Sequence, residues 1–188
     1  MAAITIDIDT DLGTLDADLR RAGKMALRGL SDGLRDGHRQ YLRDNLDNPM
    51  PFSENSLYVI GTPSATPELL VGIKDQQAEY LQYAYLGGQR DNALTPTLDA
   101  NLDSHGNMPC GYTRAVAAAD GFWMTTAKGI RGLFADNGAG GLRAVALMLD
   151  TEYDQRLDFE DEIEGIVSEA LPAATKKAFG QVFGGSGK

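Results

Sequence analysis

Apolar and polar residues alternate at the start of the chain, over Ala3–Asp9, and this period of two predicts a half-buried β-strand. Thr10, Asp11 and Thr14 then offer N-cap chemistry, and from there a period of three or four residues continues to about Leu46. This longer period predicts one amphipathic helix. Its apolar or small-residue stripe consists of Leu12, Leu15, Leu19, Ala22, Ala26, Leu30, Gly33, Gly37 and Tyr41.

Four glycines, Gly23, Gly29, Gly33 and Gly37, lie inside this predicted helix. Each costs roughly 1 kcal/mol relative to alanine, so their presence indicates that another backbone approaches closely. The partner is either the protein's own sheet or a neighbouring subunit. We expect its own sheet, because the apolar stripe of a helix usually packs against one.

Proline ends the helix at Asn48–Pro51, since proline cannot continue a helix and biases the preceding residue toward extended backbone. Two strand-like runs follow, Ser56–Gly61 and Glu68–Lys74. The turn-forming residues 62–67 between them predict a β-hairpin with a longer loop.

The second half of the chain continues this mixture of helices and strands. A short amphipathic helix is predicted over Ala78–Leu86, and Gly111–Ala119 has weaker helical potential. Three strand-like runs follow at Phe122–Ala127, Gly129–Phe134 and Leu142–Leu149, with a glycine-rich hairpin turn between the last two.

A second long amphipathic helix is predicted from Phe159 to Ala178, and Pro172 within it predicts a kink or a break. We expect the glycine-rich tail, about residues 181–188, to be flexible. Together the elements predict an α+β fold in a single domain, residues 1–188. One antiparallel sheet is packed by the long N-terminal helix and the C-terminal helix, and a long ordered loop covers about residues 87–111.

The composition fits a globular protein with one core, since the chain has 188 residues of which 43% are hydrophobic. No apolar run approaches the roughly 18–20 residues that span a bilayer, and the N-terminus lacks the basic and apolar regions of a signal peptide. We therefore expect a soluble protein without a membrane partner. The single cysteine, Cys110, excludes an intrachain disulfide framework and a multi-cysteine zinc site.

The charge of the chain bears on whether it binds nucleic acid. The 17 basic residues against 27 acidic ones give a net charge of −10 and a pI near 4.6. Sequence-specific DNA binding needs a basic footprint on the phosphates and is not expected here. Basic residues do gather between Arg20 and Arg43, but aspartates interleave with them, which predicts a mixed-charge, solvated helix face. The basic residues are Arg20, Arg21, Lys24, Arg28, Arg35, Arg39 and Arg43.

Catalytic candidates are few. His38 and His105 are the only histidines, and Asp103–His105 with Cys110 is the arrangement that suggests a nucleophile and a base. Its spacing matches no catalytic signature that we can name, so His105 is better interpreted as part of a turn.

Two further segments suggest ligands and are better explained by local structure. The acidic residues 158–164 lack the alternating ligands and central glycine of a calcium loop, and their position favours interaction with a helix dipole. Asp136–Gly141 is not followed by the lysine of a phosphate loop and fits a hairpin turn. We expect no enzymatic activity, no metal and no cofactor.

The segment Tyr80–Gly111 contains a run of turn residues longer than the 12–15 that are usual in compact domains, and such loops are commonly functional. It keeps apolar anchors at Leu94, Leu98, Leu102 and Met108. These anchors indicate a docked loop.

The same segment carries a resemblance to a known family. It reads YLxYxxxGG from Tyr80, then Arg90, then P-x-L-D at Pro96–Asp99 and D-x-x-GNMP at Asp103–Pro109. This pattern resembles the tailed-bacteriophage head–tail joining and tail-completion proteins, often described as minor tail protein Z-like. The resemblance continues more loosely through Lys128–Leu133 and around Tyr153–Phe159. Asp91 and Asn92 depart from it, since basic residues are expected after Arg90.

The resemblance implies a non-enzymatic virion protein that forms a homo-oligomeric ring at the neck, completes the tail and joins it to the capsid connector. The expected partners are the head-connector and tail proteins, and DNA passes without specific binding. The expected location is the virion, or the host cytoplasm during assembly. A tail terminator or other tube-end ring protein remains an alternative, as does a small intracellular enzyme. Candidate subunit-interface residues are Tyr85, Gly87, Gly88, Arg90, Leu94, Leu98, Asn107 and Met108.

Overall fold

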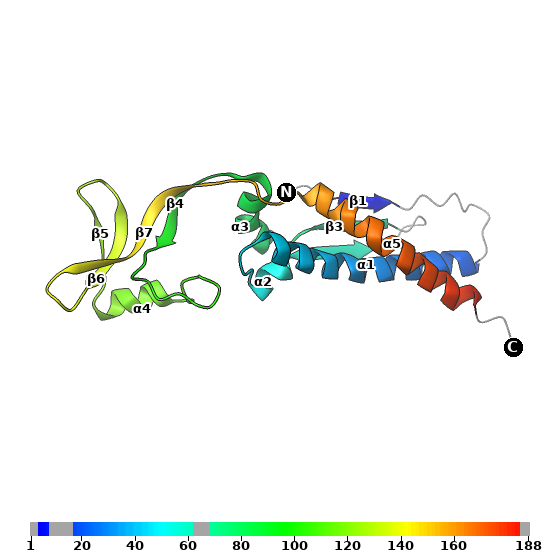
Figure 1. Ribbon diagram of the computed structural model, residues 1–188, viewed down its shortest axis with the longest axis horizontal. Coiled ribbons are helices and arrows are strands. Elements are labelled where there is room, and N and C mark those ends of the chain that lie inside the picture. The colour runs from blue at the N-terminus through cyan, green and yellow to red at the C-terminus, as the bar shows by residue number, and fades with distance from the viewer. Residues whose placement is uncertain (1–3, 8–16, 62–67, 185–188) are drawn as a thin grey trace. The chain divides into compact units, whose positions relative to one another are not determined.

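The computed structural model describes residues 4–7, 17–61 and 68–184 (Figure 1). The chain is an α+β protein that divides into two compact units, residues 1–86 with 155–188 and residues 87–154. The expected single domain with one sheet is therefore wrong. Residues 87–154 pair their strands with one another and enclose a small core of their own around Leu133, Ala135 and Val145.

The first unit combines a three-stranded antiparallel sheet of order β1-β3-β2 with helices α1 and α5. The predicted N-terminal strand and the β-hairpin are confirmed, whereas the predicted N-cap residues and the turn 62–67 lie outside the described residues. The elements of this unit are β1 Ile4–Asp7, α1 Ala17–Asn45, α2 Pro51–Glu54, β2 Leu57–Gly61, β3 Glu68–Ile73, α3 Asp75–Leu86 and α5 Phe159–Phe183.

Alternation in β2 and β3 turns one face of this sheet inward. Leu57, Val59, Leu69 and Val71 are buried there and pack with Leu30 and Leu34 of α1 in one hydrophobic cluster. Ile163 of α5 joins the same cluster. The predicted stripe is confirmed at Ala22, Ala26 and Leu30, but beyond Leu30 the buried side of α1 follows Leu34, His38 and Leu42 and not the expected Gly33, Gly37 and Tyr41.

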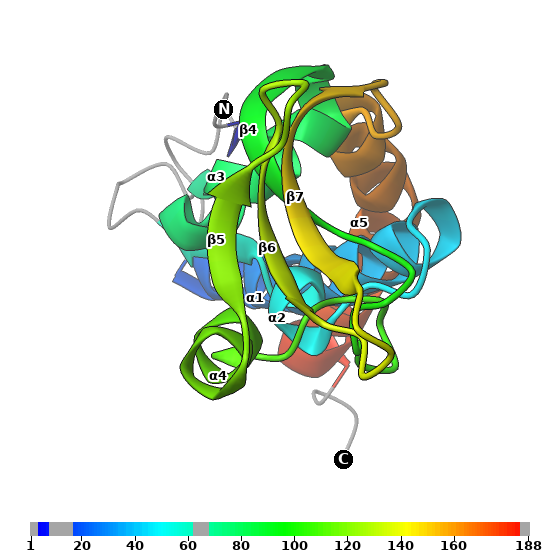
Figure 2. The same ribbon diagram turned by 90° about the vertical axis from the view of Figure 1, so that its left-hand side faces the viewer.

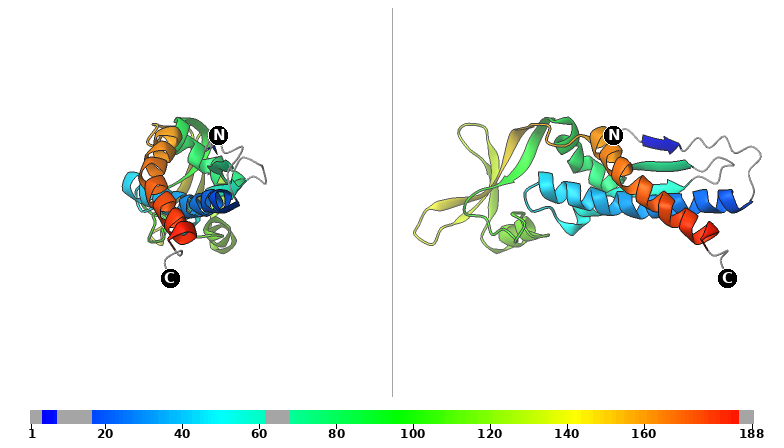
Figure 3. Two further views of the ribbon diagram at one scale, coloured as in Figure 1. Left: turned by 90° about the vertical axis from the view of Figure 1, so that its right-hand side faces the viewer. Right: turned by 45° about the vertical axis from the view of Figure 1, so that its right-hand side comes forward.

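The glycine face of α1 packs against α5, and the expectation that it meets the sheet is wrong (Figure 3). A Cβ added at Gly33 would lie 2.9 Å from Cβ of Ala170, and one added at Gly29 would lie 3.2 Å from Cβ of Ala174. Small residues on both helices allow this close approach. No described residue of another element lies within 4 Å of a Cβ added at Gly23.

α5 is one continuous helix in which Pro172 does not cause a break. Pro172 lies on the exposed side of the helix. The helix continues through it although proline has no N–H to donate to a backbone hydrogen bond. The helix also extends through residues 181–183 of the expected flexible tail, whereas residues 185–188 lie outside the description.

The second unit is a four-stranded antiparallel sheet of order β4-β7-β6-β5 with one short helix, α4 (Figure 2). The predicted short helix and three strands are confirmed, and the glycine-rich turn closes the hairpin between β6 and β7. The elements are β4 Gly88–Pro96, α4 Tyr112–Ala119, β5 Phe122–Thr125, β6 Arg131–Asp136 and β7 Leu142–Tyr153.

β4 occupies the first part of the segment that was expected to be a loop, so the loop itself is confined to residues 97–111. The strand is not recognisable from the sequence because its pairing with β7 shifts register between Arg90 and Ala93. Asn92 has a positive φ of 52° there, and its backbone N–H donates to Asp150 of β7 over 2.9 Å. Pairing with β7 imposes a strand on residues with little strand propensity of their own.

Candidate functional site

A fully buried polar network lies in the core of the first unit. His38 of α1 has its Nε2 atom 2.7 Å from the Ser56 hydroxyl and its Nδ1 atom 2.5 Å from Oε1 of Glu162. The hydroxyl of Tyr85 donates to the other carboxylate oxygen, Oε2, over 2.8 Å. Because both oxygens of Glu162 accept hydrogen bonds, the carboxylate is satisfied on both sides.

Periodicity places His38 and Glu162 in the core. His38 lies four residues after Leu34 and four before Leu42, so it belongs to the buried stripe of α1. Glu162 lies in the first turn of α5 beside the buried Ile163. The sequence analysis did not identify this network, although a histidine in register with buried leucines is a signal that could have indicated it.

Tyr85 belongs to this core and not to a subunit interface. Its side chain is 3% exposed, and its ring meets Phe159 edge-on with 5.8 Å between the ring centroids. Burial raises the pKa of its phenol, and the adjacent charge and hydrogen bond of Glu162 raise it further. The expectation that Tyr85 contacts a neighbouring subunit is therefore wrong.

The order Ser56–His38–Glu162 has the connectivity of a nucleophile, a base and an orienting acid. The side chain of Ser56 is 0% exposed, however, and a nucleophile has to reach its substrate. The three residues instead connect α1, α5 and the residue before β2 by hydrogen bonds. Such a network favours one unique packing of the core.

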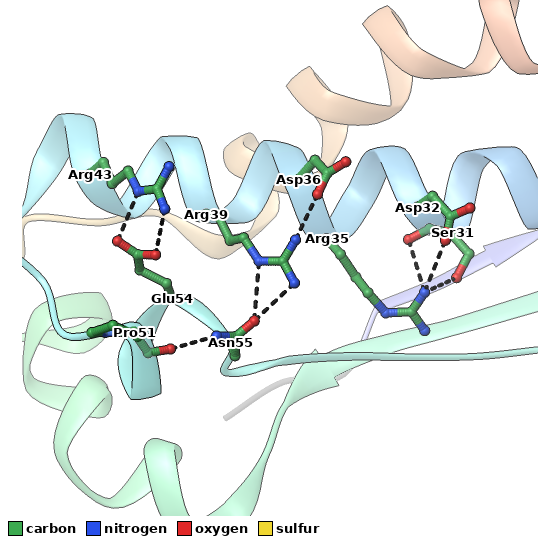
Figure 4. Close-up of polar contacts among 9 residues, drawn as sticks. All are labelled: Ser31, Asp32, Arg35, Asp36, Arg39, Arg43, Pro51, Glu54 and Asn55. Atoms are coloured by element: carbon green, nitrogen blue, oxygen red, sulfur yellow. Dashed lines mark hydrogen bonds and ion pairs between the residues drawn. The ribbon is translucent and has the colours of Figure 1, made fainter.

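Three arginines in the second half of α1, Arg35, Arg39 and Arg43, are engaged in ion pairs or hydrogen bonds within the chain (Figure 4). Their side chains bind groups of α2, of β2 and of the residue after α2, so the mixed-charge face of α1 also holds these segments against the helix. Arg35 donates to the Val59 carbonyl, Arg39 to the side chain of Asn55, and Arg43 forms a bidentate pair with Glu54.

The loop 97–111 is shaped by a tight turn at Asp103–Asn107. One oxygen of the Asp103 carboxylate accepts the backbone N–H groups of His105 and Asn107, and Gly106 has a positive φ of 79°. The hydrogen bond from Asn107 is the main cause that lowers the pKa of Asp103, and the contact with His105 adds to it. The interpretation of His105 as turn structure is confirmed, since the nearby carboxylate binds backbone amides.

Of the other candidate interface residues, Gly87 lies directly before β4, Gly88, Arg90 and Leu94 lie on β4, and Leu98, Asn107 and Met108 lie on this loop. Leu98 is fully exposed, Leu94 is partly exposed, and Met108 is half-buried. Gly88, Arg90 and Asn107 are exposed, whereas Gly87 is partly buried. Gly87 and Gly88 have φ values of 66° and 112°, so the chain enters β4 through two conformations that favour glycine.

One face of the second unit's sheet carries exposed apolar side chains. Leu133 and Ala135 of β6 face the α4 side, where Tyr112 and Val116 pack on them. Alternation turns Phe134 to the opposite face, next to Phe122, its partner on β5. Phe122 is 42% exposed, and Leu142 at the start of β7 is 57% exposed.

No protein family, curated protein or solved structure matches the chain. In the described part of the chain, no group of three or more histidine, cysteine, aspartate or glutamate residues is placed to bind a metal ion. Nor does any helix within residues 17–61 and 68–184 combine the length and apolar character needed to cross a membrane.

Proposed function

We propose that the chain is a structural protein of a tailed-phage virion, which forms a homo-oligomeric ring at the neck, completes the tail and joins it to the capsid connector. The proposal rests on the resemblance of Tyr80–Pro109 to the joining and completion proteins. The observation that carries it furthest is the exposure of Leu98 on a well-defined loop. Leu94 of β4 and Leu102 of the same loop are exposed as well, and several exposed apolar side chains along one segment fit a contact with another protein better than a single one does.

A ring requires two different patches on each subunit, because each copy contacts its two neighbours through unlike surfaces. The loop 97–111 with Leu94 of β4 is one candidate patch. The apolar sheet face with Phe122 and Leu142 is a candidate for contact with an adjacent ring or neighbour. Both surfaces belong to the second unit and can be altered without touching the core of the first.

A structural role is supported by the enclosure of Ser56, which leaves the most enzyme-like arrangement of the described residues without access for a substrate. The net charge of −10 also fits a channel through which DNA passes, because like charge opposes binding of the phosphates.

Electron microscopy of particles assembled without this protein tests the role. We expect separate heads and tails, and antibody labelling of complete particles at the neck. Normal particles in its absence, or labelling elsewhere in the virion, would exclude it.

A point substitution tests the surface. Leu98→Asp should block joining while the thermal unfolding midpoint of the purified protein stays unchanged. Ile60→Asp is the matched control, because Ile60 is an exposed apolar residue of β2 in the first unit. Equal joining by both variants would show that the loop is not a contact surface.

The alternatives give different results in the same experiments. A tail terminator predicts tails of uncontrolled length when the protein is missing. A small enzyme that uses Ser56 predicts covalent labelling by a fluorophosphonate, which the burial of this serine should prevent.

A further inference from the structure

Charge is distributed unevenly along the antiparallel pair α1 and α5. The contact of Gly37 with Ile166 and that of Gly29 with Ala174 fix the direction of the pair, so the start of α1 lies beside the end of α5 (Figure 3). The two ends of this helix pair differ in sign, although the whole chain is acidic.

The basic end is formed by the first half of α1 and the second half of α5. Its six cations are all exposed, and none of them forms an ion pair with another described residue. Asp18 is the acidic residue of α1 in this stretch, and residues 170–183 of α5 contain no acidic residue. The cations are Arg20, Arg21, Lys24, Arg28, Lys176 and Lys177.

The acidic end is formed by the last turn of α1 and the first turns of α5. Its carboxylates are exposed, and the arginines described at this end, Arg43 and Arg156, already pair with Glu54 and Asp47. The acidic residues are Asp44, Asp158, Glu160, Asp161 and Glu164. Asp158 also caps α5, accepting the backbone N–H groups of residues 160 and 161.

We propose that the basic end of one copy binds the acidic end of a second copy, so that chains associate head to tail through their α1–α5 pairs. The contact joins two unlike patches, which is the heterologous type that generates rings or open filaments. It supplies one interface of the proposed neck ring and in that sense rests on the proposed function.

A second copy satisfies both ends at once, which is the reason to prefer it to nucleic acid. DNA would neutralise the cations but leave the negative charge of the acidic end unbalanced, and it would approach a chain of net charge −10. The six cations, which have no ion-pair partner among the described residues, and the five carboxylates also match closely in number. The contact should weaken with salt, because exposed charges are screened over about 10 Å at 0.1 M and about 3 Å at 1 M ionic strength.

Sedimentation velocity of the purified full chain tests the contact by charge reversal. K176E/K177E removes most of the net positive charge of the basic end, and D44K/E164K removes most of the net negative charge of the acidic end, while each variant keeps the other end intact. Each variant alone should have a dissociation constant for self-association at least about tenfold higher than the parent. An equimolar mixture of the two should associate again, because each supplies the end that the other lacks.

Controls separate this result from effects of net charge and folding. R114E/K128E applies the same change of charge as K176E/K177E on exposed residues of the second unit, and should associate like the parent. Circular dichroism should give unchanged thermal midpoints for all variants. Association that survives both reversals, or a mixture that stays monomeric, would overturn the head-to-tail contact.

Fluorescence anisotropy with a double-stranded DNA oligonucleotide tests the other occupant. DNA binding that K176E/K177E abolishes, in a chain that remains monomeric, would overturn the proposal in favour of nucleic acid. Antibody labelling keeps the two proposals distinguishable. If the protein is labelled at the neck but the mixed variants stay monomeric, the contact alone is rejected. If the mixed variants associate but the protein is not labelled in virions, the neck function alone is rejected.

Discussion

The Nδ1 atom of His38 lies 2.5 Å from Oε1 of Glu162, so residues 124 positions apart in the chain share one buried contact. It joins the middle of α1 to the first turn of α5, and Ser56 and Tyr85 complete it from two other segments. Breaking a buried polar network is costly because the remaining groups stay away from water without partners.

Glu162→Leu should lower the free energy of unfolding by about 3–5 kcal/mol, because it leaves His38 and Tyr85 buried without their acceptor. Urea denaturation followed by far-ultraviolet circular dichroism measures the loss. Glu169→Leu is the control on the exposed side of the same helix and should change stability by less than about 0.5 kcal/mol. Equal effects of the two substitutions would show that the network does not stabilise the fold.

Tyr85→Phe should lower the free energy of unfolding by about 1–3 kcal/mol. The ring keeps its edge-on contact with Phe159, but one carboxylate oxygen of Glu162 loses its donor. In a double-mutant cycle with Glu162→Leu, the second substitution should cost much less than it does alone. Strict additivity would mean that the hydroxyl and the carboxylate do not interact energetically.

Gly33→Ala should destabilise the protein by about 1–3 kcal/mol, because the added Cβ would lie 2.9 Å from Cβ of Ala170 and the helices would have to separate. Gly23→Ala should instead stabilise it by about 0.4–1 kcal/mol, since apart from the helix's own backbone no described residue lies within 4 Å of the added atom. Thermal unfolding compares the two variants, and adding Ala170→Gly to Gly33→Ala should recover part of the loss. A stabilising Gly33→Ala would rule out tight packing at this position.

The Asp103 carboxyl should titrate below its ordinary pKa of 3.8, because the folded turn donates backbone N–H groups to its charged form. A lowered pKa in the folded state stabilises the turn above the ordinary value, and this contribution is lost as the pH falls through the lowered one. Acid should therefore open the turn at Asp103–Asn107. Nuclear magnetic resonance titration of the carboxyl measures the pKa, and a value at or above 3.8 would contradict the prediction.

Asp103→Asn provides the control for this titration. Asparagine keeps a side-chain oxygen that can accept from the amides of His105 and Asn107 but does not ionise in this range. The amide chemical shifts of these residues should then be independent of pH between about 2 and 5, around the ordinary carboxyl range.

Much of the first unit could be predicted because its signals are local. The spacing of Ala22, Ala26 and Leu30 indicates the buried side in the first half of α1, and the apolar runs around residues 62–67 define the hairpin of β2 and β3. β4 could not be predicted in the same way. Its register shift near Asn92 and its pairing with β7 depend on residues about sixty positions away.

The sequence alone determined the α+β class, the positions of the long helices and the acidic character of the chain, because periodicity and composition are properties of neighbouring residues. The tertiary structure decided that α1 turns its glycines toward α5, that Tyr85 is buried and that Leu98 is exposed. These outcomes depend on which distant segments exclude water together. The association of His38 with Glu162 is of this kind, since only packing of the whole first unit brings α1 and α5 into contact.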